Sequence, residues 1–427
     1  MRVFKFGGAS VKNAEAVKNL ESILVEFPGD KLVVVVSAMG KMTNKLEEVN
    51  ARFNSEEDWN GPFDDFVNFH ESIVSDLGGL TVGAEAQMTK FVAELKSLLN
   101  EVPSQDVRFN YDRIVSYGEL LSTTVVHGYL AKSNERVEWL DVRNVIITDR
   151  DHGRADVDWD RSARGAGLMD HHLNEGETDI LITQGFIGSS NLGNTTTLGR
   201  EGSDFSAAIL GYLCDAQDVT IWKDVPGMLN ADPKWFNNTV VLDEVSYREA
   251  LELSYYGASV IHPKTIKPLQ NKEIPLYVKS FVDSSAPGTT IHSNTTDSKP
   301  VPAYIFKPDQ VLISISPKDF SFIVEENLSE IFQLMSDVGI HINLMQNSAL
   351  NFSVVVDNDA AKLQQLTDLL SHLFSVKYNT GLKLFTVRHY DRATVDQLSK
   401  GHEKLLEQKS RHTLHMALRE LEPLDQG

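Results

Sequence analysis

The stretches VFKFGGAS (residues 3–10) and LVVVVSAMG (residues 32–40) decide the fold of this chain. Each is a short run of β-branched and aromatic residues that ends in small residues, which is typical of a strand followed by a tight turn. Between them the apolar residues have helical spacing as far as Phe27, and Pro28-Gly29 then breaks the helix. The order strand, glycine turn, helix, strand predicts a βαβ unit whose two small-residue turns lie at one edge of a parallel sheet.

The same alternation continues along the N-terminal part of the chain. Short apolar runs predict further strands at residues 137–140, 145–148, 180–183, 219–222 and 274–279, with helical segments between them. This alternation predicts an α/β fold with a mainly parallel sheet. Residues 50–105 are charged and helical apart from a break at Gly78-Gly79, and they suggest no chemistry.

A linker separates this part from the C-terminal part. Residues 293–302, SNTTDSKPVP, have linker composition. The apolar pattern after them predicts strand, helix, strand, strand, helix, strand, which is the βαββαβ order of a ferredoxin-like fold. A helix at about residues 395–408 and a strand at residues 412–418 are then expected.

Composition excludes several classes of protein. The chain has 427 residues, which predicts two or three domains, and its net charge of -20 argues against nucleic-acid binding. The one cysteine, Cys214, excludes a disulfide framework and is interpreted as a small core residue. With neither a leader pattern nor an apolar run of membrane length, a soluble, cytoplasmic protein is expected.

Residues 184–208, QGFIGSSNLGNTTTLGREGSDFSAA, connect a predicted strand to a predicted helix. Their five glycines let backbone amides approach a ligand closely. Ser203 or Asp204 is expected to cap the helix, and a helix N-terminus suits a phosphate or carboxylate. The alternative is a long solvated loop, but long loops without secondary structure are usually functional or disordered. The stretch therefore predicts an active-site loop.

Lys5, directly before Gly7-Gly8, points to phosphate chemistry. The lysine can neutralise a transferred phosphoryl group while glycine amides donate to its oxygens; the alternative is a solvated lysine at a strand edge. The Walker pattern GxxxxGK[ST] is absent, which argues against a P-loop enzyme. Arg200 is the best candidate to clamp a carboxylate, with a surface ion pair as its alternative. Glu119 follows Gly118, where a helix is predicted to start, so it also has a structural interpretation as a charge on the helix dipole.

Seven motifs occur in one order: KFGGAS (5–10), SAMG (37–40) followed by Thr43-Asn44, GELLST (118–123), QGFIG (184–188), TTLGREGSD (196–204), DVPG (224–227) and His262-Pro263. Together they resemble the aspartokinases of the amino-acid kinase superfamily, from about residue 1 to residue 390. The resemblance implies a three-layer α/β/α kinase domain (1–295), an ACT-like regulatory domain (303–390) and a remnant of a second ACT-like unit (391–427). It also implies transfer of the ATP γ-phosphoryl group to the side-chain carboxylate of L-aspartate, which gives 4-phospho-L-aspartate for lysine, threonine and methionine biosynthesis.

The resemblance assigns roles to individual residues. Catalytic positions match Lys5, Asp204 and Arg200, and aspartate-binding positions match Thr43, Glu119, Phe186, Arg200, Ser203 and Asp204. ATP-binding positions match Lys5, Gly7, Gly8, Ser10, Ser37, Gly40, Lys223, Asp224, Lys234 and Lys264. Asp204 would hold Lys5, and Glu119 would pair with the α-ammonium of aspartate or orient a positioning lysine. Because the sequence shows no metal-ligand cluster, Mg²⁺ is expected to arrive with ATP. An aspartate carboxylate is already ionised at pH 7, so no strong general base is needed.

Three positions depart from the family pattern. Glu201 stands at the second glycine of TLGRGGSD, Ala9 replaces the threonine of KFGGTS, and Ser259 replaces a lysine expected near the nucleotide phosphates. Lys223, where threonine or serine is common, or Lys264 could restore that charge. Lys234 stands where arginine is common.

Two other functions remain open at this point. One is an amino-acid kinase for glutamate or acetylglutamate, although Glu119 with TLGRxGSD favours aspartate. The other is a non-catalytic amino-acid sensor, in which Glu201 and Ser259 mark lost turnover. Regulation through paired ACT units would require a homodimer with an amino-acid effector. Because the chain ends at Gly427, no fused homoserine dehydrogenase is expected.

Overall fold

The structure is a computed structural model, and it describes residues 1–257, 261–293, 301–319 and 321–421. The chain forms two compact units. The first comprises Met1–Met228, Val241–Leu251 and Val260–Thr296, and the second comprises Leu229–Val240, Glu252–Ser259 and Asp297–Gly427. The domain boundaries expected from the sequence stay predictions.

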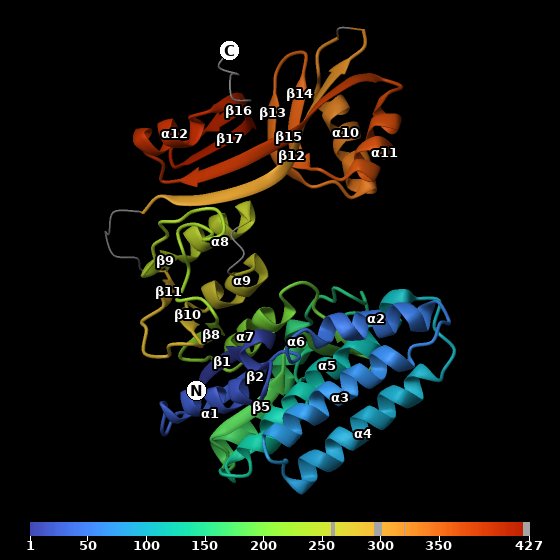
Figure 1. Ribbon diagram of the computed structural model, residues 1–427, viewed down its shortest axis with the longest axis vertical. Helices are drawn as coiled ribbons and strands as arrows, with labels where there is room; N and C mark the ends of the chain where they lie inside the picture. The colour runs from blue at the N-terminus through green and yellow to red at the C-terminus, as the bar shows by residue number, and fades with distance from the viewer. Residues whose placement is uncertain (258–260, 294–300, 320, 422–427) are drawn as a thin grey trace, which may run out of the picture. The chain divides into compact units, whose positions relative to one another are not determined.

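A mainly parallel sheet forms the centre of the first unit (Figure 1). Its strands in spatial order are β3 (Val137–Leu140), β5 (Ile180–Gln184), β2 (Leu32–Val36), β1 (Arg2–Phe6), β8 (Val219–Lys223), β10 (Leu276–Ser280), β11 (Thr289–His292) and β9 (Glu244–Ser246). From β3 to β10 each strand is parallel to its neighbour, and β11 is antiparallel to β10. All five residues of β2 are buried, as expected for a strand covered on both faces.

Helices cover both faces of this sheet and complete three layers. One face packs against α1 (Ala14–Val25), α3 (Asn60–Asp76), α4 (Val82–Leu99) and α5 (Val107–Leu130) through a shared apolar cluster. On the other face lie α6 (Trp159–Asp170), α7 (Gly202–Leu213) and α9 (Pro263–Asn271). The remaining helical segments are η1 (Gly8–Val11), α2 (Met42–Asn54), η2 (Val142–Asn144), η3 (His171–Glu175) and α8 (Tyr247–Tyr256). The predicted α/β fold with a mainly parallel sheet is confirmed.

Strand β1 separates apolar from functional side chains by simple alternation. Phe4 and Phe6 belong to the cluster shared with α1, and the Phe6 ring stacks on Trp222 of β8 with centroids 6.0 Å apart. Lys5, between them, projects to the opposite face of the sheet, where α7 packs on β1. The alternation of side chains along β1 therefore directs the buried side chain of Lys5 towards α7.

Residues 184–208 connect a strand to a helix, as predicted, but they are not one continuous loop. Within this stretch β6 (Ile187–Ser190) and β7 (Thr195–Thr197) form an antiparallel hairpin, and β6 also pairs with β4 (Ile147–Thr148). These strands escaped the apolar pattern because their buried residues are largely hydroxylated. The Thr148 and Thr196 hydroxyls, for example, hydrogen-bond to each other at 2.7 Å.

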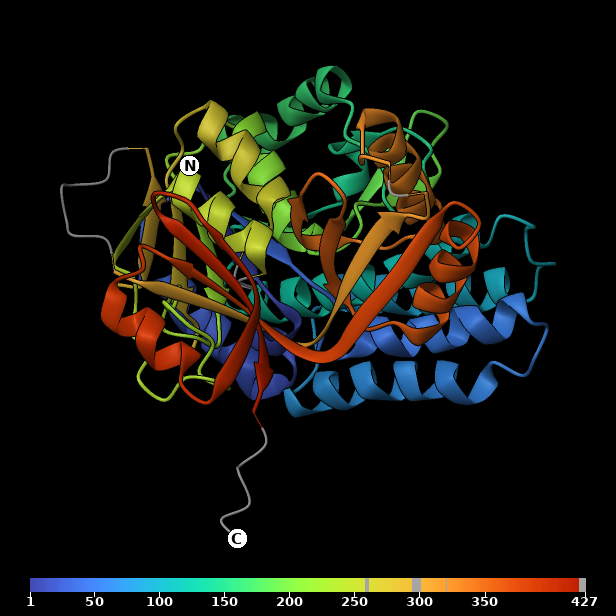
Figure 2. The ribbon, with the colours of Figure 1, turned by 90° about the horizontal axis from the view of Figure 1, so that it is seen from above.

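The second unit is built on an antiparallel sheet. Its strands in spatial order are β13 (Ile342–Asn347), β14 (Phe352–Asp357), β12 (Ala303–Pro317), β15 (Phe374–Arg388), β17 (Thr413–Glu420) and β16 (His402–Lys409). The chain order β12, α10 (Glu325–Val338), β13, β14, α11 (Ala360–Leu370), β15 confirms the predicted βαββαβ order. Strands β12 and β15 pair from end to end (Figure 2).

The C-terminal extension differs from its prediction. Helix α12 (Arg392–Ser399) ends well before residue 408, and residues 402–409 form β16 instead. Strand β17 pairs with both β15 and β16, so this tertiary pairing overrides the local helical pattern. A small core of Leu414, Met416 and Leu418 packs with Val395 and Leu398 of α12.

Candidate active site

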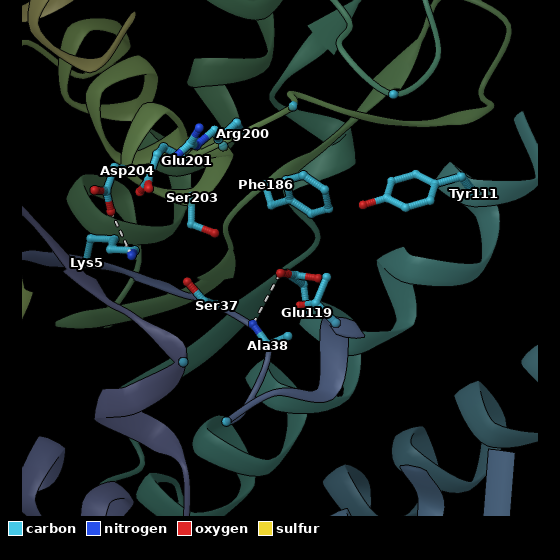
Figure 3. Close-up of a pocket in the computed structure, with 16 residues that line it drawn as sticks. Lys5, Ser37, Ala38, Tyr111, Glu119, Phe186, Arg200, Glu201, Ser203 and Asp204 are labelled. Carbon is cyan, nitrogen blue, oxygen red and sulfur yellow. Dashed lines mark hydrogen bonds and ion pairs between the residues drawn. The ribbon is translucent and has the colours of Figure 1, made fainter. Parts of the chain in front are cut away.

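A pocket of about 630 Å³ opens in the first unit, where β1 and β2 end (Figure 3). Open α/β sheets bind ligands at this carboxyl edge. The lining residues come from β1, from both glycine turns, from α2 and α5, from the segments after β4 and β5, and from the residues between β7 and the first turn of α7. They are Lys5, Gly8, Ser37, Ala38, Gly40, Thr43, Tyr111, Glu119, Gly153, Phe186, Gly199, Arg200, Glu201, Gly202, Ser203 and Asp204.

The two small-residue turns lie against each other. The Gly40 N–H donates to the Gly8 carbonyl at 3.0 Å, and the Ser37 N–H donates to the Phe6 carbonyl at 3.1 Å. A Cβ atom on Gly8 would lie 2.7 Å from the Ala38 carbonyl oxygen, so only glycine permits this approach. The turns therefore form one surface of backbone groups beside Lys5, which suits a phosphate.

Asp204 lies between two lysines. It is 1% exposed, its Oδ1 is 2.7 Å from Lys5 Nζ, and its Oδ2 is 3.2 Å from Lys223 Nζ. Burial acts to raise the pKa of Asp204, but the two ammonium groups outweigh it and hold the pKa below its usual value. Asp204 is therefore an anion, and it fixes the position of the Lys5 ammonium, whose residue is 7% exposed.

Glu119 is a buried carboxyl group on the pocket wall and 2% exposed. Its Oε1 accepts from the Ala38 N–H at 3.2 Å, whereas Oε2 accepts no hydrogen bond from any residue that the structure describes. Burial raises the pKa of Glu119 to about 8. The structural interpretation of Glu119 was wrong, because α5 starts at Val107 and places Glu119 in the middle of the helix, away from the positive end of its dipole.

Arg200 supplies a cation at the mouth of the pocket. Its side chain is exposed and has no ion-pair partner among the described parts of the chain. Phe186, with a φ of 67°, forms a wall next to it. Helix α7 starts at Gly202 and not at the expected Ser203 or Asp204 caps, and the residue before it, Glu201, has a left-handed φ of 56°. A guanidinium with no partner beside a helix start can bind a carboxylate.

Six of the predicted site residues do not line this pocket. Gly7 and Lys223 lie directly next to it through Lys5 and Asp204. Asp224 is exposed beyond the end of β8, and the Ser10 hydroxyl donates to the Trp222 carbonyl at 3.5 Å. Lys264 lines a second pocket, with Nζ 6.0 Å from the centre of the Phe205 ring, and Lys234 belongs to the second unit. Their ATP-binding roles stay predictions. Ser259 lies outside the described residues.

Two lining residues, Tyr111 and Gly153, lie outside every motif quoted from the sequence, and neither was assigned a site role from the sequence. Between them lies a buried network in which Asp112 accepts from Thr197 Oγ1 at 2.6 Å, from the Gly153 N–H at 3.1 Å and from His152 Nδ1 at 2.7 Å. This network ties β7 and the segment after β4 to α5, so it fixes the shape of the pocket. The spacing of Tyr111 and Glu119, eight residues on one helix, could have revealed Tyr111 if the helix start had been found.

No group of three or more His, Cys, Asp and Glu side chains could hold a metal ion in residues 1–257, 261–293, 301–319 and 321–421. Over the same ranges, no helix has the length and apolar character needed to cross a membrane.

The fold and the pocket define a class of protein. The sequence matches the model of the amino acid kinase family over residues 1–280, and the chain belongs to that family. It is 32% identical over 390 residues to lysine-sensitive aspartokinase 3 of Escherichia coli, covering 90% of this chain and 85% of that protein. Within the family, the chain groups with the aspartokinases.

Two further comparisons agree with this grouping. A structure of E. coli aspartokinase III in complex with aspartate and ADP matches with a TM-score of 0.80 and 29% identity, covering 98% of this chain and 96% of that one. Bifunctional aspartokinase/homoserine dehydrogenase 2 of Arabidopsis thaliana is 29% identical over 391 residues, covering 89% of this chain. The chain spans 42% of the length of that bifunctional relative.

Glu201→Gly is expected to stabilise the protein by up to about 1 kcal/mol, because a non-glycine residue in the left-handed region is strained. It should also lower the KM for the carboxylate substrate a few-fold, since it removes a negative charge beside Arg200. Thermal unfolding and substrate titration measure the two effects. Glu201→Gln separates them, because it removes the charge and keeps the strain. If Glu201→Gly unfolds at a lower temperature than the unmodified chain, the strain argument fails.

Proposed function

We propose that this chain is an aspartate kinase, which transfers the γ-phosphoryl group of ATP to the side-chain carboxylate of L-aspartate. The product is 4-phospho-L-aspartate, for the synthesis of lysine, threonine and methionine. One observation carries the proposal: a single pocket joins an edge built from Lys5 and two glycine turns to an exposed guanidinium and a buried carboxyl group.

The charges of the pocket complement those of aspartate. Arg200 would bind the α-carboxylate with two parallel hydrogen bonds. Glu119, once ionised, would bind the α-ammonium group. The side-chain carboxylate is then the remaining anionic group, and it would face Lys5. Because this carboxylate is already ionised at pH 7, the reaction requires positioning and charge screening but no strong base.

The phosphate edge would hold the other substrate, ATP with Mg²⁺. Backbone groups of the Gly8 and Gly40 turns would cradle the phosphates, and Lys5 would neutralise the charge that spreads over the transferred group. A carboxylate oxygen of aspartate forms the new P–O bond as the bond to ADP breaks. Asp204 would act through Lys5, because its ion pair at 2.7 Å holds the ammonium in place.

Trapping of the acyl phosphate with hydroxylamine tests the proposal. The full chain is incubated with ATP, Mg²⁺ and either L-aspartate or L-glutamate, and the hydroxamate and ADP are both quantified. Aspartate hydroxamate is expected in equal amount to ADP, with at least about tenfold less product from glutamate, because the pocket must place the longer side chain differently. Product from glutamate alone would indicate a glutamate kinase. No product from either acid would indicate an amino-acid sensor.

The second unit has the strand and helix order of an ACT-like domain, and we propose that it is regulatory. An amino-acid effector would bind there between the units of two chains, which requires a homodimer. A cytoplasmic location is proposed from the single cysteine, which suits a reducing compartment.

A further inference from the structure

Tyr111 stands at the end of the pocket that lies opposite Lys5. Tyr111 and Glu119 both line the pocket from α5, roughly two helical turns or about 12 Å apart along the axis. Figure 3 shows Lys5 and Tyr111 on opposite sides of the pocket, with Phe186 and Glu119 between them, and the hydroxyl end of Tyr111 is turned inwards. A ligand that extends from Lys5 past Glu119 therefore runs towards the Tyr111 side chain.

The side chain of Tyr111 is held in place from a second helix. Its hydroxyl donates to Glu47 Oε1 on α2 at 3.0 Å. Glu47 lies one helical turn after Thr43, which also lines the pocket. Burial raises the pKa of Tyr111, and the charge of Glu47 is the second cause, so the hydroxyl keeps the proton that it donates. This hydrogen bond ties α5 to α2 and fixes the ring at the end of the pocket.

The groups that would bind the α-carboxylate and the α-ammonium of an acceptor can adapt more easily than this ring. Arg200 is exposed and has no ion-pair partner in the ranges that the structure describes, so its guanidinium can follow a shifted carboxylate. Glu119 Oε2 accepts no hydrogen bond from a described residue and can take an ammonium in more than one position. An acceptor longer by one methylene keeps its side-chain carboxylate at Lys5 and moves its α-carbon away from it. Tyr111 is then the rigid group that limits the length.

We propose that Tyr111 is a specificity-determining residue of the acceptor site, the end wall that admits aspartate and excludes glutamate. Glu47 is its positioning residue, which acts through the hydroxyl of Tyr111. The inference rests on the proposed function, because it assumes that the side-chain carboxylate of the acceptor lies at Lys5. A pocket that rejects one additional methylene group changes kcat/KM by about 10- to 200-fold.

Hydroxamate formation from L-aspartate and from L-glutamate by variants of the full chain tests the inference. Tyr111→Ala is expected to lower the ratio of kcat/KM for aspartate to kcat/KM for glutamate by at least about tenfold, while the KM for ATP changes less than about twofold. Tyr111→Phe retains the ring and should keep most of the ratio. Tyr129→Phe is the matched control, because Tyr129 lies on the same helix and donates to Glu21 at 2.8 Å, outside the pocket. It should leave all constants unchanged.

An unchanged ratio in Tyr111→Ala, or an equal loss of activity with both acids, would overturn the inference. Thermal unfolding verifies the fold, and Tyr111→Leu gives the same test with less loss of packing if Tyr111→Ala does not fold. Equilibrium titration with each amino acid keeps the test independent of turnover. If the unmodified chain makes no hydroxamate, the proposed function fails, but a gain of glutamate affinity in Tyr111→Ala still supports the end wall, and no gain refutes it.

Discussion

Lys5→Met is expected to lower kcat for aspartyl phosphate formation by about 10³-fold, the effect of removing one preorganised charge from the site of a developing negative charge. The variant should still fold, because Asp204 keeps its second ion pair with Lys223 at 3.2 Å. Methionine retains most of the aliphatic stem that is packed on β1. Hydroxamate formation at saturating ATP and aspartate measures kcat, and thermal unfolding verifies the fold.

A double-mutant cycle shows whether Asp204 acts through Lys5. Asp204→Asn alone should lower kcat, and adding it to Lys5→Met should cause little further loss, because a positioning residue has nothing left to position. Lys18→Met removes a lysine that pairs with Glu15 on the surface of α1, and it should have no effect. More than a tenth of the original kcat in Lys5→Met would contradict the assigned role.

The parallel sheet could be predicted because its pattern is local. Residues 32–36 were predicted with the bounds that the structure shows, since a continuous apolar run bounded by turn residues has few alternatives. The predicted bounds of residues 137–140 also match the structure. The βαββαβ order of the second unit followed from the same rule. In each case the apolar residues that define the pattern of the strand or helix are also the residues that the fold buries.

The hairpin β6–β7 could not be predicted in this way. Its buried positions include Ser189, Thr196 and Thr197, so they leave no apolar period. The hydroxyls of Thr196 and Thr197 are satisfied by hydrogen bonds to Thr148 and Asp112 in other segments. The prediction for the residues of β16 was wrong for the opposite reason. The sequence of β16 has good helix formers, but its pairing with β17 decides the structure, and that pairing is not local.

The start of α5 determined how much of the site was found. Asp106 caps this helix by accepting from the N–H groups of Arg108 and Phe109 at 3.0 and 3.3 Å. A helix that is predicted to start only at Gly118 does not include Tyr111 and Asp112. The motif residues could be identified without knowing where the helix begins, because glycine turns and charged groups can be recognised in the sequence. The residues that support the pocket can be recognised only once the fold is known.

Glu119→Gln is expected to raise the KM for aspartate by about 100-fold, because it leaves the buried α-ammonium group without its counter-ion. It should also change the pH dependence of binding. The pKa of Glu119 is about 8, so in the unmodified protein aspartate affinity should rise between pH 6.5 and pH 8.5 as the carboxyl group ionises. In the variant this rise should be absent. Titration of aspartate at several pH values measures both effects.

The same variant, Glu119→Gln, is expected to lose aspartate affinity but to gain stability relative to the unmodified chain as the pH rises. A carboxyl group whose pKa is raised from 4.5 to about 8 by folding keeps a proton in the folded chain that the unfolded chain has lost. Its contribution to stability is therefore full below pH 4.5 and is lost as the pH rises through 8. Glutamine carries no charge at any pH, so the stability of Glu119→Gln relative to the unmodified chain should increase from pH 5 to pH 8.

Glu101→Gln, which removes a surface partner of Arg113, is the matched control and should show no such trend. Parallel unfolding curves across this range would mean that Glu119 is ionised in the folded protein, and the pH dependence predicted for aspartate binding would then fail with it.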